Sequence, residues 1–243
     1  MLRITVLSLF IFPWFFLAAM SFPGVSSAQD LSCAKCHPDI GKGQKYRHPA
    51  INLGCSSCHL PKVGRQHPKE KESMQLTYDI PTLCFHCHKE KKFTGKYIHL
   101  PTERAMCMMC HDPHQSDIED LLRSEPQELC YRCHAREKFT KPYIHKVALG
   151  GCGIRCHNHH ASDYPHLLSS EIGDLCIGCH KIQESGTHIV SLPGGKVHPV
   201  FWTKDPGKRK RAMTCSSCHN PHGSKYRKLF IYKPICKRCH KIY

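Results

Sequence analysis

The cysteines of this chain follow one repeated pattern, in which two cysteines separated by two residues are followed at once by a histidine. Eight such C-x-x-C-H segments occur between Cys33 and His240. A ninth pair, Cys152 and Cys156, has one additional residue between the cysteines and also precedes a histidine, His157. Together the nine pairs use all 18 cysteines. A pattern that accounts for every cysteine constrains the fold more than the distribution of apolar residues does.

Three kinds of chemistry use closely spaced cysteines: disulfides, structural zinc and covalent c-type haem. Neither disulfides nor zinc ribbons require a histidine directly after the second cysteine. Covalent haem does require it, because the two thiols bond the porphyrin vinyl groups and the next imidazole binds the iron. All nine pairs carry the histidine, in a chain with 21 His among 243 residues. We therefore expect nine covalently attached haems c.

The attachment sites predict two sets of residues. The expected thioether bonds involve Cys33, Cys36, Cys55, Cys58, Cys84, Cys87, Cys107, Cys110, Cys130, Cys133, Cys152, Cys156, Cys176, Cys179, Cys215, Cys218, Cys236 and Cys239. The expected proximal iron ligands are His37, His59, His88, His111, His134, His157, His180, His219 and His240. In the longer segment the extra residue must loop out, and Gly151 and Gly153 tolerate the positive φ that such a loop needs. The alternative for Cys152 and Cys156 is a disulfide beside solvent-exposed histidines.

The attachment sites also form an internal repeat. Four units, at about 31–66, 83–122, 129–168 and 175–230, each carry two sites, and a single site at 236–240 follows them. This pattern resembles the doubled CXXCH family of multihaem cytochromes c over nearly the whole chain after residue 28. The resemblance implies bis-histidine haems in an extended stack, with the sixth iron ligand supplied by histidines outside the attachment sites.

Twelve histidines remain for that role. Seven recur at equivalent places, either midway between paired sites or three residues after the second site: His48, His99, His145, His198, His114, His160 and His222. In the first unit the nearest spare histidine is His67. The ninth ligand is expected from His86, His159, His166 or His188, with His86 and His188 favoured. Four methionines are alternative ligands, although packing against porphyrin is favoured for them: Met106, Met108, Met109 and Met213.

Chain length limits the fold that can form around these cofactors. Residues 29–243 form the expected nonahaem domain, and nine haems leave about 24 residues for each, too few for a separate apolar core. We expect a mostly irregular coil with short α-helices after the attachment sites, wrapped around a stack of covalent haems, with negligible β-sheet. An insertion in the fourth unit, which includes 191–195 and 208–211, is expected to be a loop.

The first 28 residues have the features of an export signal. Arg3 precedes an apolar run from Ile4 to Met20, and Ser26, Ser27 and Ala28 form a small-residue cleavage site. We expect cleavage after Ala28 and a mature protein in the periplasm or associated with the outer membrane. The alternative is an uncleaved membrane anchor, because the run approaches the length that spans a bilayer.

The formal net charge of +16 would ordinarily indicate nucleic acid or an anionic membrane as partner. Nine haems would bring two propionates each, so most lysines are expected to balance cofactor, and no nucleic acid is expected. The predicted function is electron transfer in the bacterial cell envelope, without enzymatic turnover. The expected partners are an inner-membrane or periplasmic donor, an outer-membrane or extracellular acceptor, an outer-membrane porin, and other copies of the chain. The alternatives are a reductase with one open haem and a polymerising filament subunit.

Overall fold

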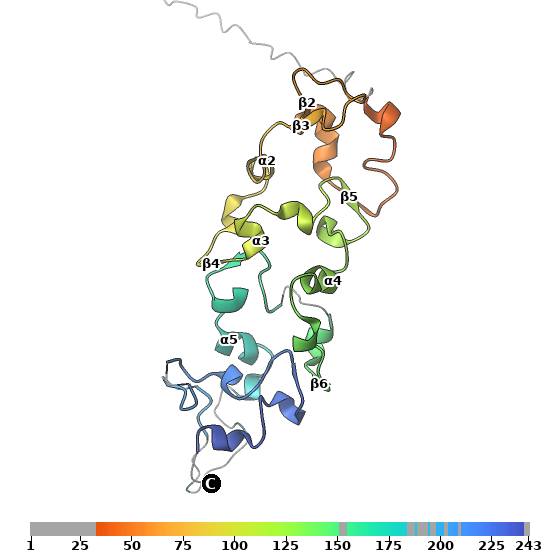
Figure 1. The fold of residues 1–243 in the computed structure, drawn as a ribbon. Coiled ribbons are helices and arrows are strands. Elements are labelled where there is room, and N and C mark those ends of the chain that lie inside the picture. Colours follow the sequence, from red (N-terminus) through yellow and green to blue (C-terminus); the bar gives the residue numbers. More distant parts are fainter. Residues whose placement is uncertain are drawn as a thin grey trace, which may run out of the picture.

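The computed structural model describes residues 33–150, 155–183, 188, 194, 198–201, 204–208 and 210–240. The predicted export signal and the predictions for Gly151, Cys152 and Gly153 lie outside the described residues. The described chain is elongated and runs from one end of the molecule to the other in sequence order (Figure 1). The first unit (orange) and the last segments (blue) therefore lie at opposite ends, with the second and third units between them.

The α-helices are short and lead into attachment sites or follow the midway histidines. Among them α2, α4 and α5 end close to the first cysteine of an attachment site, so the helix delivers that cysteine. Their bounds are α2 Thr82–Phe85, α3 Leu100–Glu103, α4 Pro126–Tyr131 and α5 Ile172–Ile177. Proline at the first position of α4 suits the helix start, where the missing N–H costs no intrahelical bond. No helix in the described part of the chain is long and apolar enough to cross a bilayer.

Turns of 3-10 helix make up most of the remaining regular structure. Three of them follow attachment sites, as expected for helices in that position, whereas the longer α-helices precede the sites instead. The 3-10 helices are η1 Pro49–Leu53, η2 Cys55–Ser57, η3 Glu90–Phe93, η4 Cys107–Met109, η5 Glu119–Leu121, η6 Arg136–Lys138, η7 Lys146–Gly150, η8 Pro165–Leu167, η9 Lys181–Gln183, η11 Cys215–Ser217, η12 Arg227–Leu229 and η13 Ile235–Arg238.

Sheet structure in the described residues is limited to two-stranded antiparallel ladders of two or three residues per strand. The strands are β1 Tyr46–Arg47, β2 His59–Pro61, β3 Met74–Leu76, β4 Tyr97–Ile98, β5 Gln115–Ser116, β6 Tyr143–Ile144, β7 Ala161–Ser162 and β8 Gly223–Ser224. β2 of the first unit pairs with β3 in the segment that follows this unit, whereas β1–β5, β4–β7 and β6–β8 each join two consecutive units. The small ladders therefore act as clasps between neighbouring units.

The described residues do not form an ordinary apolar core. Only Ala161 and Met213 are buried apolar side chains among them, whereas Leu53, Leu149 and Ile182 are more than 60% exposed. The fold is mostly irregular, in agreement with the expected fold class. The described insertion residues contain one isolated bridge, between Asp205 and Lys208, and otherwise form turns and loops.

Candidate haem-binding sites

Each of the nine attachment-site histidines lies opposite a histidine from outside the attachment sites. The ring centroids of the two partners are 5.8–6.2 Å apart in every pair. The pairs, with the attachment-site histidine first, are His37–His67, His59–His114, His88–His48, His111–His160, His134–His99, His157–His222, His180–His145, His219–His188 and His240–His198.

This spacing fits one metal ion between the two rings of each pair. A metal–imidazole bond is about 2.0 Å long, so a shared metal separates the two ligand nitrogens by about 4 Å. The distances from each nitrogen to its ring centre make up the rest of the measured separation. Seven pairs have nearly parallel rings, with interplanar angles of 12–27°. The angle is 43° for His188 and His219 and 72° for His198 and His240.

Most pairs join residues of two different units. The midway histidine of one unit faces the first attachment site of the next, as His48 faces His88. The histidine three residues after a second site faces the second site of the preceding unit, as His114 faces His59. The second to fourth units continue this exchange, and His198 faces the terminal site. Only the ends depart from it, because His67 and His188 pair within their own units.

The clasps between units hold the exchanged histidines. Directly beside the β1–β5 ladder, the backbone N–H of His48 donates to the carbonyl of His114 at 2.8 Å. The same bond joins His99 to His160 at 2.8 Å and His145 to His222 at 3.3 Å. Each ladder therefore fixes two ligand candidates at once, one for each of the two units that it joins.

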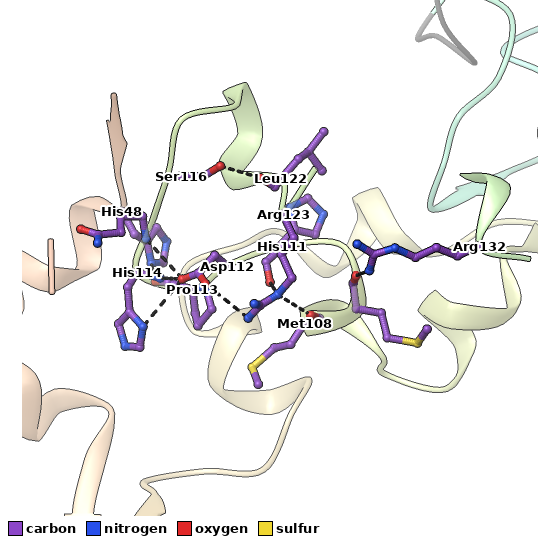
Figure 2. A network of polar contacts seen from close by, with 12 residues as sticks. His48, Met108, His111, Asp112, Pro113, His114, Ser116, Leu122, Arg123 and Arg132 are labelled. Carbon is purple, nitrogen blue, oxygen red and sulfur yellow. Dashed lines mark hydrogen bonds and ion pairs between the residues drawn. The ribbon is translucent and has the colours of Figure 1, made fainter. Parts of the chain in front are cut away.

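Hydrogen bonds at Nδ1 set the orientation of several rings. His111 Nδ1 lies 2.8 Å from the carbonyl oxygen of Asp120. His48 Nδ1 lies 2.8 Å from the carbonyl oxygen of Pro113 (Figure 2). A carbonyl only accepts, so Nδ1 carries the proton and Nε2 keeps its lone pair for a metal. Equivalent bonds, from further ring Nδ1 atoms to carbonyl oxygens, join His157 to His166, His219 to Lys228, His99 to His159 and His198 to Pro199.

The carbonyl oxygens that accept hydrogen bonds from Nδ1 of the attachment-site histidines belong to a recurring turn. Asp120, His166 and Lys228 have φ of 57°, 59° and 56°, which turns each carbonyl toward the ring nine residues earlier in the chain. A buried serine closes the turn by donating to the carbonyl six residues later: Ser116 to Leu122, Ser162 to Leu168 and Ser224 to Phe230.

A side chain just before the distal histidine completes the motif. Asp112 Oδ1 accepts the backbone N–H of His114 at 3.0 Å, and Asn158 and Asn220 do the same for His160 and His222. In the second unit the Asp112 carboxylate also pairs with Arg123 at 3.3 Å, and Arg123 donates to the carbonyls of Met108 and His111 (Figure 2). Sequence reasoning missed the Asx and serine positions, although both stand at fixed offsets from the distal histidine in three units.

Burial affects the protonation of several distal candidates. Burial lowers the pKa of His160, and the neighbouring His111 lowers it further. The same causes, burial followed by the paired ring, lower the pKa of His222 and His188. These rings therefore favour the neutral form, which is the form that binds a metal.

One continuous cavity of about 4840 Å³ runs through the molecule. All 18 paired histidines and the 17 attachment cysteines of the described residues line it. One ninth of this volume is about 540 Å³, within the range of about 300–1,000 Å³ that cofactor pockets have. The exposed apolar side chains Leu53, Leu149 and Met108 also line it, which gives them an apolar partner if the cavity holds porphyrin.

Two pairs of attachment sites that follow one another in sequence are also neighbours in space. Burial raises the pKa of the Cys84 thiol, from the third site, and the nearby Cys107, from the fourth, raises it further. Helix α5, which contains Cys176 of the seventh site, packs against η11, which contains Cys215 of the eighth. These two neighbour relations and the continuous cavity fit a row of sites in the order of the sequence.

The remaining candidates lie elsewhere. His86 packs edge-on against Tyr78, with ring centroids 4.4 Å apart, and faces no attachment-site histidine in any contact that the structure records. His159 and His166 supply carbonyl oxygens to His99 and His157. Of the methionines, Met106, Met108 and Met109 are 39–47% exposed and Met213 is buried, and all four line the cavity.

Comparison with protein families agrees with the repeat. The doubled CXXCH motif family matches residues 48–93, 99–139, 145–184 and 208–242. The chain belongs to this family of c-type multihaem cytochromes. Each doubled CXXCH match joins the second site of one unit to the site that follows it, so that the first site, at Cys33, stands before the first match. Among curated proteins, no sequence matches the chain.

Proposed function

We propose that this protein is an electron-transfer cytochrome that holds nine c-type haems, each ligated by two histidines. The observation that carries the proposal is the set of nine histidine pairs, each with one attachment-site member, along one continuous cavity. Haem supplies one-electron redox chemistry at its iron when it is bound. The doubled CXXCH family supports covalent haem at these sites.

The chain has three tasks in this proposal. The cysteines form thioether bonds that fix each porphyrin, and the paired histidines ligate the iron from both sides. The carbonyls of Asp120, His166 and Lys228 hold the Nδ1 proton and thereby orient three of the proximal rings. The left-handed turns keep those carbonyls in place, so the ligand orientation is built into the fold.

The linear order of the sites supports entry and exit of electrons at opposite ends of the molecule. The first and ninth sites lie at the two ends of the described chain (Figure 1). Cys36, His37, Cys236 and His240 are all exposed, so little polypeptide covers either terminal site. We propose these sites as the contacts for donor and acceptor.

The proposed location is the bacterial cell envelope, after export directed by the first 28 residues. The donor would be an inner-membrane or periplasmic redox protein, and the acceptor would lie at or beyond the outer membrane. A porin would be a third partner if the cytochrome sits in an outer-membrane conduit. The apolar run after Arg3 and the small residues before Gln29 support the export part of this proposal.

Intact mass and carbon monoxide binding test the proposed function together. The exported protein should have the mass of the chain from Gln29 plus nine haems, and all irons should be six-coordinate and low-spin. A mass with eight haems would show that Cys152 and Cys156 do not attach one. Strong carbon monoxide binding by the reduced, unsubstituted protein would overturn full bis-histidine ligation and favour the reductase alternative.

A further inference from the structure

The charged side chains are distributed very unevenly along this row of sites. Residues 29–184 contain 21 Lys and Arg and 18 Asp and Glu. After Glu184 the sequence has 13 Lys and Arg and a single acidic residue, Asp205. The described residues of this last segment carry the eighth and ninth attachment sites and ten of these basic residues, and they lie at one end of the molecule (Figure 1). The positive charge of the protein is therefore concentrated at that end.

The single acidic side chain of the segment does not reach the surface. Asp205 is 0% exposed, and its carboxylate lies 3.4 Å from Arg211 Nε and 3.7 Å from an amino nitrogen of Arg238. Its backbone neighbours Gly207 and Lys208 donate to the same carboxylate. By contrast, eight other cationic side chains of the described segment are exposed: Lys204, Lys208, Lys210, Lys225, Arg227, Lys228, Lys233 and Lys237.

Bound cofactor would not cancel this charge. The segment has 13 basic residues and one acidic residue, a difference of +12. Two haems attached there would add four propionates, which leaves roughly +8 with ferrous iron and more with ferric iron. A surface of this charge attracts negatively charged partners over distances of about one Debye length, which is about 10 Å at 0.1 M salt.

The ninth attachment site lies within this basic surface. Cys236 and His240 are exposed, and Ile231, between Arg227 and Lys233 in sequence, is 37% exposed. A partner held by the lysines could therefore approach the ninth site closely. Basic side chains around an accessible redox site and an apolar side chain match a protein partner, because such interfaces combine a charged rim with apolar contacts.

We propose that this basic end, residues 198–201, 204–208 and 210–240, is the docking surface for an acidic protein that carries its own redox centre. The inference rests on the proposed function and deepens it, because it assigns a partner chemistry to one end of the row. The exposed lysines would speed association and orient the partner toward the ninth site. The opposite end, near the first site, would meet a partner that is not selected by negative charge.

Two charge-reversal variants with equal charge change test this surface. The first replaces Lys208, Lys210, Lys225 and Lys233 with Glu at the basic end. The matched control replaces Lys35, Lys45, Lys69 and Lys71 with Glu at the opposite end. The probe is an acidic flavodoxin, and the measurement is the second-order rate constant of its electron exchange with the nonahaem protein. At low ionic strength the first variant should lose at least about tenfold in rate and the control less than about twofold, with the difference lost at high salt.

The outcomes separate this inference from the proposed function. Equal losses in both variants would overturn the docking surface while leaving electron transfer intact. Vesicles of phosphatidylcholine and phosphatidylglycerol that bind the basic end and block exchange with flavodoxin would also overturn it, in favour of a lipid surface. If the unsubstituted protein fails to take up and release electrons in a potentiometric titration, the proposed function itself is refuted.

Discussion

At the scale of single residues, position in the chain decides the role of a histidine more than its identity does. His159 and His160 are adjacent, yet only the ring of His160 lies opposite an attachment-site histidine, His111, at 6.0 Å. His159 contributes its backbone carbonyl to the ring of His99 instead. In the second and fourth units the residue at that position is a proline, Pro113 or Pro221, which has no imidazole that could bind a metal.

Replacing His160 with alanine should therefore create one five-coordinate, high-spin haem among nine, because His111 would lose the ring opposite it. His159→Ala should leave the spectrum unchanged, since alanine retains the carbonyl that His99 uses. Carbon monoxide titration of the reduced proteins measures the difference, with about one equivalent bound by the first variant. Equal binding by both variants would contradict the assignment of His160.

At the scale of structural elements, the insertion of the fourth unit is tied to the last two sites through Asp205. Arg238, from the ninth attachment site, lies beside Asp205 and also donates to the carbonyl of Ser217, from the eighth. Burial would raise the pKa of Asp205, but hydrogen bonds from Ser217 and Gly207 and the guanidinium of Arg238 lower the pKa overall. The carboxylate thus remains charged and holds the loop, Arg238 and both sites together.

Asp205→Asn should lower the stability of the protein, because Arg238 would keep its burial and lose its counter-charge. The loss should be about 1–3 kcal/mol, the range for removing one partner of a buried hydrogen bond. Because folding lowers the pKa of Asp205, its charged carboxylate contributes stability at pH values above the pKa of an unfolded aspartate. This contribution is lost as the pH falls through the pKa that Asp205 has in the folded protein. Thermal unfolding at several pH values measures both effects. The exposed Glu137→Gln is the control, and an equal loss there would contradict the role of Asp205.

The attachment sites can be predicted from the sequence, whereas the pairing of histidines between sites cannot. The attachment sites could be read from the chain, because covalent chemistry fixes the spacing of Cys215, Cys218 and His219 and leaves no freedom to the fold. The recurrence of His114, His160 and His222 could also be read. The ring that each one faces could not, because the partner depends on ladders of two residues, such as β4 with β7, that are too short to leave a pattern in sequence.

At the scale of the whole molecule, the exchange of histidines makes neighbouring units depend on one another. The second site of the third unit, at His157, faces His222 of the fourth unit. The first site of the fourth unit, at His180, faces His145 of the third. Each boundary thus carries two ligand pairs in opposite directions, reinforced by one backbone clasp. An inner unit taken alone would lack partners for both of its sites.

A chain that ends after Ser170 tests this dependence. It would keep six attachment sites and lose His222, so one haem, at His157, should become high-spin and bind carbon monoxide. Pairing within units would instead leave the six remaining sites with their ligands. The full-length protein with His222→Ala is the second measurement, because it should show the same single high-spin haem among nine even if the shortened chain folds poorly.

The two-way exchange has a consequence for how such a protein can change in length. An inserted unit would receive one histidine from each neighbour and return one to each, so every iron in the enlarged row would still have two ligands. Only the outermost units need histidines of their own, and His67 and His188 meet that need here. In this respect they resemble the caps of solenoid repeats. Duplication of whole inner units could therefore lengthen the row of sites without any new ligand residues in the outermost units.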